Sequence, residues 1–220
     1  EQLYPHLKGG QVLIDMSSID PGVSREIGEK LAEKQVGMLD APVSGGEPKA
    51  VDATLSFMVG GQDALFRQYA PLLKTMGRTV TYCGPLGAGN TVKLANQMIV
   101  AANIAAAAEG LMLARRNGVS PETVFHAVRG GLAGSAVMEA KVPMMLRNDT
   151  QPGFRIRLHI KDLKNALRAA ADSGSPAPLS SVVMQQLLAV QEAGFSEADH
   201  SAIAKYYEAL TGETLYEPDL

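Results

Sequence analysis

The sequence predicts two successive parts, an α/β layered domain and then an all-helical domain. In the first 90 residues, short apolar runs alternate with amphipathic segments, the pattern of strands that alternate with helices. Alanine supports the division, because the first 90 residues hold 7 alanines and the remaining 130 hold 23. Alanine favours helices and is depleted in strands, so its increase marks the change from a mixed to a helical domain.

Four strands and two helices are predicted in the first part. A helix is expected between the first two strands, with Asp20 or Ser18 as its N-cap and Pro21 in its first turn. A second helix of similar composition is expected at residues 63–76. The strands are the apolar runs at residues 11–16, 37–41, 54–59 and 79–83, each of which ends near Gly, Pro or Ser.

The second part is predicted to be helical throughout. Residues 91–117 predict one Ala-rich helix about 40 Å long, which ends at Gly118 in the C′ position. Ser120 and Pro121 predict the start of the next helix, because Ser is a common N-cap and Pro is favoured at the first helical position. Further helices are expected at residues 134–146, 161–173, 179–192 and 200–210.

Charge and cysteine content exclude several classes of function. The net charge is −3 and no run of Lys or Arg is longer than two, so we expect neither a nucleic-acid partner nor a membrane surface. The longest apolar stretch, residues 98–108, is too short for a membrane span. A single cysteine, Cys83, excludes an internal disulfide and fits a cytoplasmic location. The four histidines lack metal-ligand spacing, so we expect no metal.

Two motifs carry side chains that could do chemistry. In DAPVSGG, residues 40–46, Ser44 offers a hydroxyl and the glycine pair could direct backbone N–H groups at an anion; a plain tight turn fits this local pattern equally well. In GPLGAGNTVKLANQ, residues 84–97, a glycine-rich loop precedes a helix that carries Lys93, Asn96 and Gln97 on one face. A solvated first turn is the alternative, but three polar groups beside such a loop favour a site.

A third motif, LHIKDL at residues 158–163, is by itself structural, because Lys161 and Asp162 read as the charged start of a helix after an aromatic turn. The dinucleotide fingerprint G-x-G-x-x-G occurs nowhere in the 220 residues, since Gly87 and Gly89 begin one but Val92 stands at the third glycine. Residue 1 is Glu and the first ten residues show no signal-peptide pattern, so we expect the chain to begin inside a longer protein.

These motifs together resemble the β-hydroxyacid dehydrogenases. The segment DAPVSGGEPKAVDATLSFMVGG resembles their substrate-binding signature, GAGNTVKLANQ their catalytic-lysine helix, and LHIKDLKNAL their cofactor-side lysine motif. The resemblance covers nearly all of the chain. It implies that residues 1–86 are the C-terminal portion of a Rossmann-type NAD(P)-binding domain, and that residues 87–220 are a complete helical domain for substrate binding and oligomerisation, entered through a long interdomain helix.

The resemblance also implies a role for individual residues. Lys93 matches the catalytic lysine, which would act as general acid and base in the NAD(P)-dependent reduction of a small β-semialdehyde acid. The positions that match substrate contacts are Ser44, Gly45, Gly46 and one of the two amides, Asn96 or Gln97. The positions that match cofactor contacts are Ser18, Phe154, Lys161 and Asp162.

The sequence leaves some alternatives open. It does not decide between NAD and NADP, because the residue that discriminates them in the family would precede Glu1. The substrate could be 3-hydroxyisobutyrate, glyoxylate or succinate semialdehyde, or the chain could be only a helical oligomerisation module. We expect a homodimer or homotetramer. Ala53 stands where many relatives carry Gly, so we expect a negative φ there.

Overall fold

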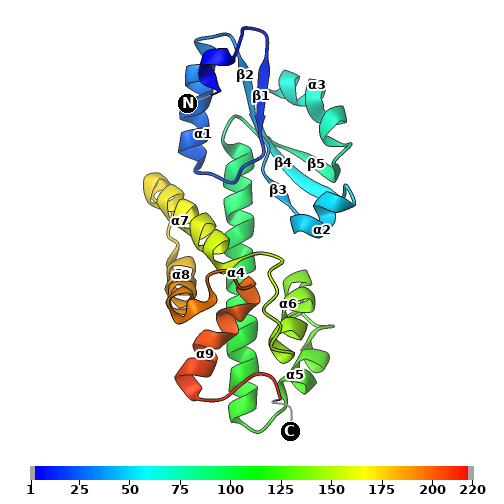
Figure 1. Ribbon diagram of the computed structural model, residues 1–220, viewed down its shortest axis with the longest axis vertical. Helices are drawn as coiled ribbons and strands as arrows, with labels where there is room; N and C mark the ends of the chain where they lie inside the picture. The colour runs from blue at the N-terminus through cyan, green and yellow to red at the C-terminus, as the bar shows by residue number, and fades with distance from the viewer. Residues whose placement is uncertain (1–2, 218–220) are drawn as a thin grey trace. The chain divides into compact units, whose positions relative to one another are not determined.

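The computed structural model describes residues 3–217 (Figure 1), and the chain divides into two compact units. The first unit comprises Glu1–Asn96 with Asn165–Ser175, and the second comprises Gln97–Lys164 with Pro176–Leu220. The domain division expected from the sequence, after residue 86, falls just before the long helix α4 (Ala88–Arg116) and stays a prediction.

The first unit is built on a mixed sheet, which confirms the α/β prediction. Strands β1 and β2 pair in parallel, as do β4 and β5, whereas β4 runs antiparallel to β2 and β3. The order is β1-β2-β4-β3, with β5 also paired to β4. In the described part of the chain the strands are β1 (Val12–Asp15), β2 (Gly37–Asp40), β3 (Val43–Ser44), β4 (Leu55–Gly61) and β5 (Gly77–Gly84).

Helices α1 (Pro21–Ala32) and α3 (Asp63–Leu73) lie on opposite sides of this sheet (Figure 1). Successive residues of a strand point to opposite faces, and Met38 packs in the cluster of α1 while Leu39 packs in the cluster of α3. Asp20 is the N-cap of α1, as one of the two expected candidates, because its Oδ1 accepts the Gly22 N–H at 2.7 Å.

Helix α4 ends as the sequence predicts. Gly118 has a φ of 78°, and the Val119 N–H donates to the Ala114 carbonyl, which closes the helix. Among the described residues, α4 is the one helix long and apolar enough to pass a composition test for a membrane span, but a buried core helix passes the same test. Ile104 and Ala108 are almost fully buried, which is the behaviour of a core helix.

The second unit is helical, as predicted. A short 3₁₀ helix (His200–Ile203) leads directly into the last helix, and one π-helical turn (Gln191–Phe195) follows α8. It contains α4 from Gln97 onward and α7 (Ile156–Ser173) up to Lys164. Its other helices are α5 (Pro121–Val128), α6 (Ala136–Leu146), α8 (Pro178–Val190) and α9 (Ala204–Thr211).

One predicted helix start was wrong and another was confirmed. Helix α7 begins at Ile156 and not at Lys161, because Ile156, Ile160 and Leu163 form an apolar stripe that packs into the core from the first turn onward. Helix α5 begins at Pro121 with Ser120 at its N-cap position, as predicted, although the Ser120 side chain makes no capping hydrogen bond.

The negative φ expected for Ala53 was also wrong, since its φ is 57°. The reason is the short helix α2 (Gly46–Val51), which the sequence analysis did not predict. Ala53 follows the C-cap of α2, and the Thr54 N–H donates to the Lys49 carbonyl at 2.9 Å, as in a Schellman motif. That motif places the residue after the C-cap in the left-handed region, at a cost of about 1–2 kcal/mol for a residue other than glycine.

Candidate active site

The Ser-Gly-Gly segment is the corner between β3 and α2. Ser44 ends β3, where it pairs with Ser56 of β4, and Gly45 is the N-cap of α2. Gly45 has a φ of 137° and Gly46 a φ of 66°, which side chains rarely tolerate. A Cβ on Gly45 would lie 2.6 Å from the Cβ of Lys49. Glycine is therefore required at this corner.

A buried carboxylate holds the start of α4. The Asp40 side chain, at the end of β2, accepts the Gly87 N–H at 2.8 Å and the Asn90 N–H at 2.7 Å. Burial raises the pKa of Asp40 above its usual value, although these two N–H groups act to lower it. Gly87 has no side chain that could cap the helix, so Asp40 supplies the acceptors that the first turn requires.

Glycines bring the start of α4 directly against the sheet. A Cβ on Gly89 would lie 2.3 Å from the Met58 carbonyl oxygen of β4, and a Cβ on Gly60 would lie 2.3 Å from the Asp40 carboxylate. Lys93 follows on the second turn and is 7% exposed. Asn96 is half-buried and Gln97 is buried on the next turn.

In the second unit, three of the residues expected from the sequence contact one another. The Gln97 Nε2 donates to Asp162 Oδ2 at 2.7 Å, and Lys161 Nζ lies 2.8 Å from Asp162 Oδ1. Asp162 is fully buried, whereas the Lys161 side chain is 46% exposed. The expected contact of Asp162 with the cofactor stays a prediction, whereas the structure shows that Asp162 orients the Gln97 amide.

His159 and His200, which the sequence analysis did not select, extend this cluster. The His159 Nε2 lies 3.1 Å from the Gln97 carbonyl oxygen, and the two Nδ1 atoms are 2.9 Å apart. A carbonyl only accepts, so His159 carries its proton on Nε2 and its Nδ1 accepts from His200. Phe154 packs edge-on against both rings. One expected cofactor residue and one expected substrate residue are thus tied together through the histidine pair.

Asp199, which directly precedes His200, forms a buried ion pair with Lys141. Lys141 Nζ donates to both oxygens of the fully buried Asp199, at 2.9 and 3.0 Å. Burial alone would raise the pKa of Asp199, but His200, backbone N–H groups and the Lys141 ammonium lower it below its usual value. Burial and His159 lower the pKa of His200 to about 3, so this imidazole is neutral. Only the adjacency of Asp199 and His200 is visible in the sequence.

Comparison with known proteins identifies the family. A family model described as the NAD binding domain of 6-phosphogluconate dehydrogenase matches residues 1–84, and one described as the NAD-binding of NADP-dependent 3-hydroxyisobutyrate dehydrogenase matches residues 87–207. The chain is 38% identical over 206 residues to the 2-hydroxy-3-oxopropionate reductase of Escherichia coli, which covers 94% of this chain and 70% of that protein. The chain belongs to the β-hydroxyacid dehydrogenase family.

Other relatives and solved structures agree with this assignment. The chain is 34% identical to the mitochondrial 3-hydroxyisobutyrate dehydrogenase of Mus musculus, over 91% of this chain and 62% of that protein. A structure of the Mycobacterium tuberculosis 3-hydroxyisobutyrate dehydrogenase with L-serine has a TM-score of 0.86 and 32% identity, over 92% of this chain and 72% of that one. The expected family and fold are therefore confirmed.

The dehydrogenase uses NAD or NADP, as its two family models show. Its own residues suit parts of such a cofactor. Ser18 offers a half-buried hydroxyl in the loop after β1, at the carboxyl end of a parallel strand, where nucleotides bind in open α/β sheets. The partly exposed ammonium of Lys161 suits an anionic oxygen. Within residues 3–217 no cluster of three potential metal ligands occurs.

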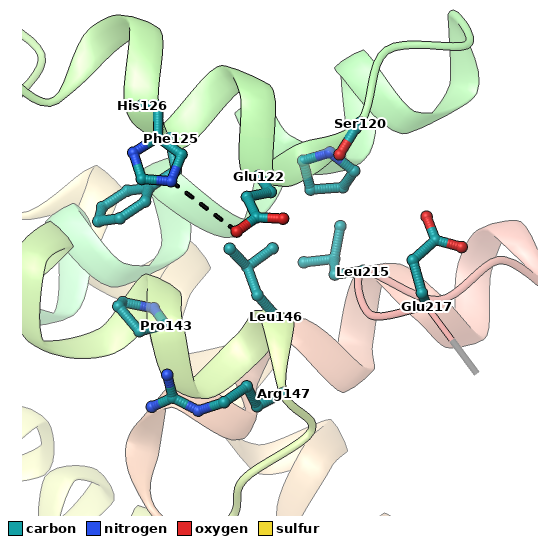
Figure 2. Close-up of a pocket in the computed structure, with 10 residues that line it drawn as sticks. Ser120, Glu122, Phe125, His126, Pro143, Leu146, Arg147, Leu215 and Glu217 are labelled. Carbon is teal, nitrogen blue, oxygen red and sulfur yellow. Dashed lines mark ion pairs between the residues drawn. The ribbon is translucent and has the colours of Figure 1, made fainter. Parts of the chain in front are cut away.

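The helical unit of the dehydrogenase also contains a cavity of about 440 Å³ (Figure 2). Apolar side chains such as Phe125, Leu146 and Leu215 line it, and at its edge Glu122 and His126 face each other at 3.8 Å. The residues expected to bind substrate or cofactor lie outside the lining of this cavity, so we give it no role in the reaction.

Proposed function

We propose that this dehydrogenase reduces tartronate semialdehyde to glycerate with NAD(P)H, with Lys93 as general acid and base. The relation to the E. coli 2-hydroxy-3-oxopropionate reductase supports the substrate, as do the segments EPKA, RGGLAGS, GFRIRLHIKDL and ADHSAIAKYYE, which resemble that subfamily most closely. The observation that carries the mechanism is the buried Lys93, on a helix whose start Asp40 holds against the sheet.

Lys93 acts on the carbonyl oxygen of the substrate. Bound NAD(P)H supplies the hydride that reduces the aldehyde carbon. As the carbonyl oxygen gains negative charge, the Lys93 ammonium stabilises it and donates one proton to it, which gives the alcohol and leaves a neutral amine. The amine then takes a proton from solvent, and in the reverse direction it removes the proton from the alcohol. Burial of Lys93 strengthens this charge interaction by excluding water.

The remaining residues hold the substrate. We assign the binding of the substrate carboxylate to Ser44, Gly45 and Gly46. The positive φ angles of the two glycines suit a turn whose backbone N–H groups bind an anion. Asn96 or Gln97 donates or accepts a hydrogen bond with the substrate oxygens. Gln97 is the better supported of the two, because Asp162 fixes the direction of its amide.

Activity measurements with tartronate semialdehyde and NADH or NADPH test this proposal, in the longest natural form of the protein. Lys93→Ala is expected to lower kcat by about 10²- to 10⁴-fold, the usual contribution of a general acid. Lys164→Ala is the matched control, because Lys164 is an exposed lysine on α7, and its kcat should stay within about twofold. Equal activity in the two variants would eliminate the lysine mechanism.

A second candidate function is the same reaction on another small hydroxy acid, because the relatives of this chain are named for different substrates. These relatives include 2-(hydroxymethyl)glutarate dehydrogenase of Eubacterium barkeri, at 35% identity, and L-threonate dehydrogenase of Cupriavidus necator, at 32%. Comparison of kcat/KM for tartronate semialdehyde, 3-hydroxyisobutyrate, glyoxylate and succinate semialdehyde decides between them. One methylene in an apolar pocket changes kcat/KM by about 10- to 200-fold, so the assay has the resolution required.

We also propose that the dehydrogenase is a cytoplasmic homodimer or homotetramer that pairs through its helical unit. Ile99 of α4, with Leu179 and Val182 of α8, is more than half exposed beside a groove of about 380 Å³. A second copy that docks on this groove would cover these exposed apolar side chains.

Sedimentation tests the assembly. Ile99→Glu places a charge on the groove and should shift the protein toward the monomer, whereas Leu132→Glu, at an exposed leucine in the loop between α5 and α6, should not. Equal sedimentation of both variants and the parent argues against this interface.

Calorimetric titration with NAD(P)H tests the remaining alternative, that the chain is an oligomerisation module without catalysis. Absence of heat at millimolar cofactor would favour that alternative.

A further inference from the structure

Asn90, on the first turn of α4, has a fully buried side chain that the mechanism above does not use. Its Oδ1 accepts the Ile19 N–H at 3.0 Å, and its Nδ2 donates to Ser24 Oγ at 3.0 Å. Its backbone N–H donates to Asp40. One residue thus joins the end of β2, the loop after β1 and helix α1 to the start of the helix that carries Lys93.

The loop after β1 depends on these bonds for its position. Asp15 Oδ1 accepts the Ser17 N–H at 3.0 Å, and Asp20 caps α1, so both ends of the loop are fixed by side chains of its own segment. Between them, the Ile19 N–H is held by Asn90, a residue 71 positions away. Without Asn90 this partly buried N–H would lose its partner, and such groups are costly to leave unpaired.

Two expected functional groups are adjacent to this contact. Ser18 directly precedes Ile19, and Lys93 follows Asn90 by three positions, which places both α4 residues on the same face of the helix. The Ser18 loop is therefore connected to Lys93 through the Asn90 side chain and one turn of α4. A shift of the loop against α4 changes the distance between these two groups directly.

We propose that Asn90 is a positioning residue that keeps the cofactor-side loop at Ser18 in register with the proton donor Lys93. This role rests on the proposed function, because the bond between Asn90 and Ile19 affects the reaction only if Ser18 contacts the nicotinamide cofactor and Lys93 contacts the carbonyl oxygen. Hydride and proton must reach the two ends of one C=O bond, so the two sources have to be held at a fixed separation.

Steady-state kinetics of Asn90→Ala, in the longest natural form of the protein, test the role. The variant removes both side-chain bonds and keeps the backbone bond to Asp40. We expect kcat/KM to fall by about 10- to 100-fold, the cost of misplacing reacting groups by about 1 Å. KM for NAD(P)H should rise, kcat should fall, and the primary isotope effect with cofactor deuterated at C4 should increase.

Ser24→Ala is the matched control, because it breaks the Asn90 Nδ2 bond at a fully buried site and leaves the bond to Ile19 intact. The Tm of both variants should fall, because each leaves a buried polar group without its partner. The kcat, KM and isotope effect of Ser24→Ala should nevertheless stay within about twofold of the parent.

The outcomes separate the two proposals. If Asn90→Ala and Ser24→Ala lose activity equally and in proportion to Tm, or if Asn90→Ala has parental kinetics, the positioning role is overturned. If Lys93→Ala retains full activity, the proposed function itself fails. Should Asn90→Ala not fold, Asn90→Ser takes its place with the same expected direction, because its shorter hydroxyl leaves Ile19 without the Asn90 oxygen.

Discussion

Acidification should destabilise the protein through His200. Its folded-state pKa is about 3 against 6.5 for a free histidine, because burial and the neighbouring His159 disfavour the charged form. The unfolded chain therefore binds a proton between these two pKa values while the folded protein does not, so stability falls as pH falls through this window. From pH 8 to pH 5 the loss amounts to about 2 kcal/mol, and at pH 3 it reaches about 4 kcal/mol.

His200→Gln isolates this contribution, because glutamine does not titrate and its Nε2 can still donate to His159. Urea unfolding followed by circular dichroism, at pH 8 and pH 5, gives the free energy of unfolding of each protein. The parent should lose about 2 kcal/mol more than the variant between the two pH values. Asp199 titrates below this interval, because its pKa is lowered. Asp40, with its raised pKa, acts in the opposite direction but equally in both proteins.

Equal losses in the parent and in His200→Gln would refute the reasoning, because they would mean that His200 takes up its proton in the folded state as readily as in the unfolded one. A larger loss in the variant would refute it too. Either result would also contradict the hydrogen-bond assignment in which His159 accepts from a neutral His200.

Three further substitutions test packing and charge, each by thermal and urea unfolding. Gly89→Ala should cost about 3 kcal/mol, since its Cβ would lie 2.3 Å from the Met58 carbonyl oxygen, which is backbone and cannot turn aside. Lys141→Met should cost about 3–5 kcal/mol, because it leaves the fully buried Asp199 without its cation. Ala53→Gly should stabilise by about 0.5–1 kcal/mol by relieving the left-handed φ of 57°. The opposite sign in any of these would contradict the corresponding contact.

Regular elements of this fold could be predicted because their signals are local. The strands stand out as apolar runs between turn residues, and Asp20 and Gly118 mark helix ends through chemistry that acts over a few residues. Helix α2 and the strand β3 escaped prediction because six and two residues are too few to show a period. The φ of Ala53 was missed for the same reason, as it belongs to the end of that unpredicted helix.

The candidate site was predictable only in part. Lys93 and Gln97 share a helix, so their spacing revealed them. His159 and His200 are 41 residues apart, and nothing in their spacing shows that their rings meet at 2.9 Å. Asp40 looked like part of the Ser-Gly-Gly motif, but its carboxylate serves α4, 47 residues further along the chain. Tertiary partners of this kind become visible only once the chain is folded.

The capping of α4 by Asp40 has a consequence for the order of folding. Most helices find their first acceptors among neighbouring residues, and so can begin before tertiary structure exists. Here the acceptor arrives from a strand, by closing loops of 47 and 50 residues. The first turn of α4 should therefore form only after β2 has docked in the sheet, and its amides should gain protection late. We therefore expect the segment that carries Lys93, the proposed proton donor, to be among the last to become ordered, after the sheet that holds it is complete.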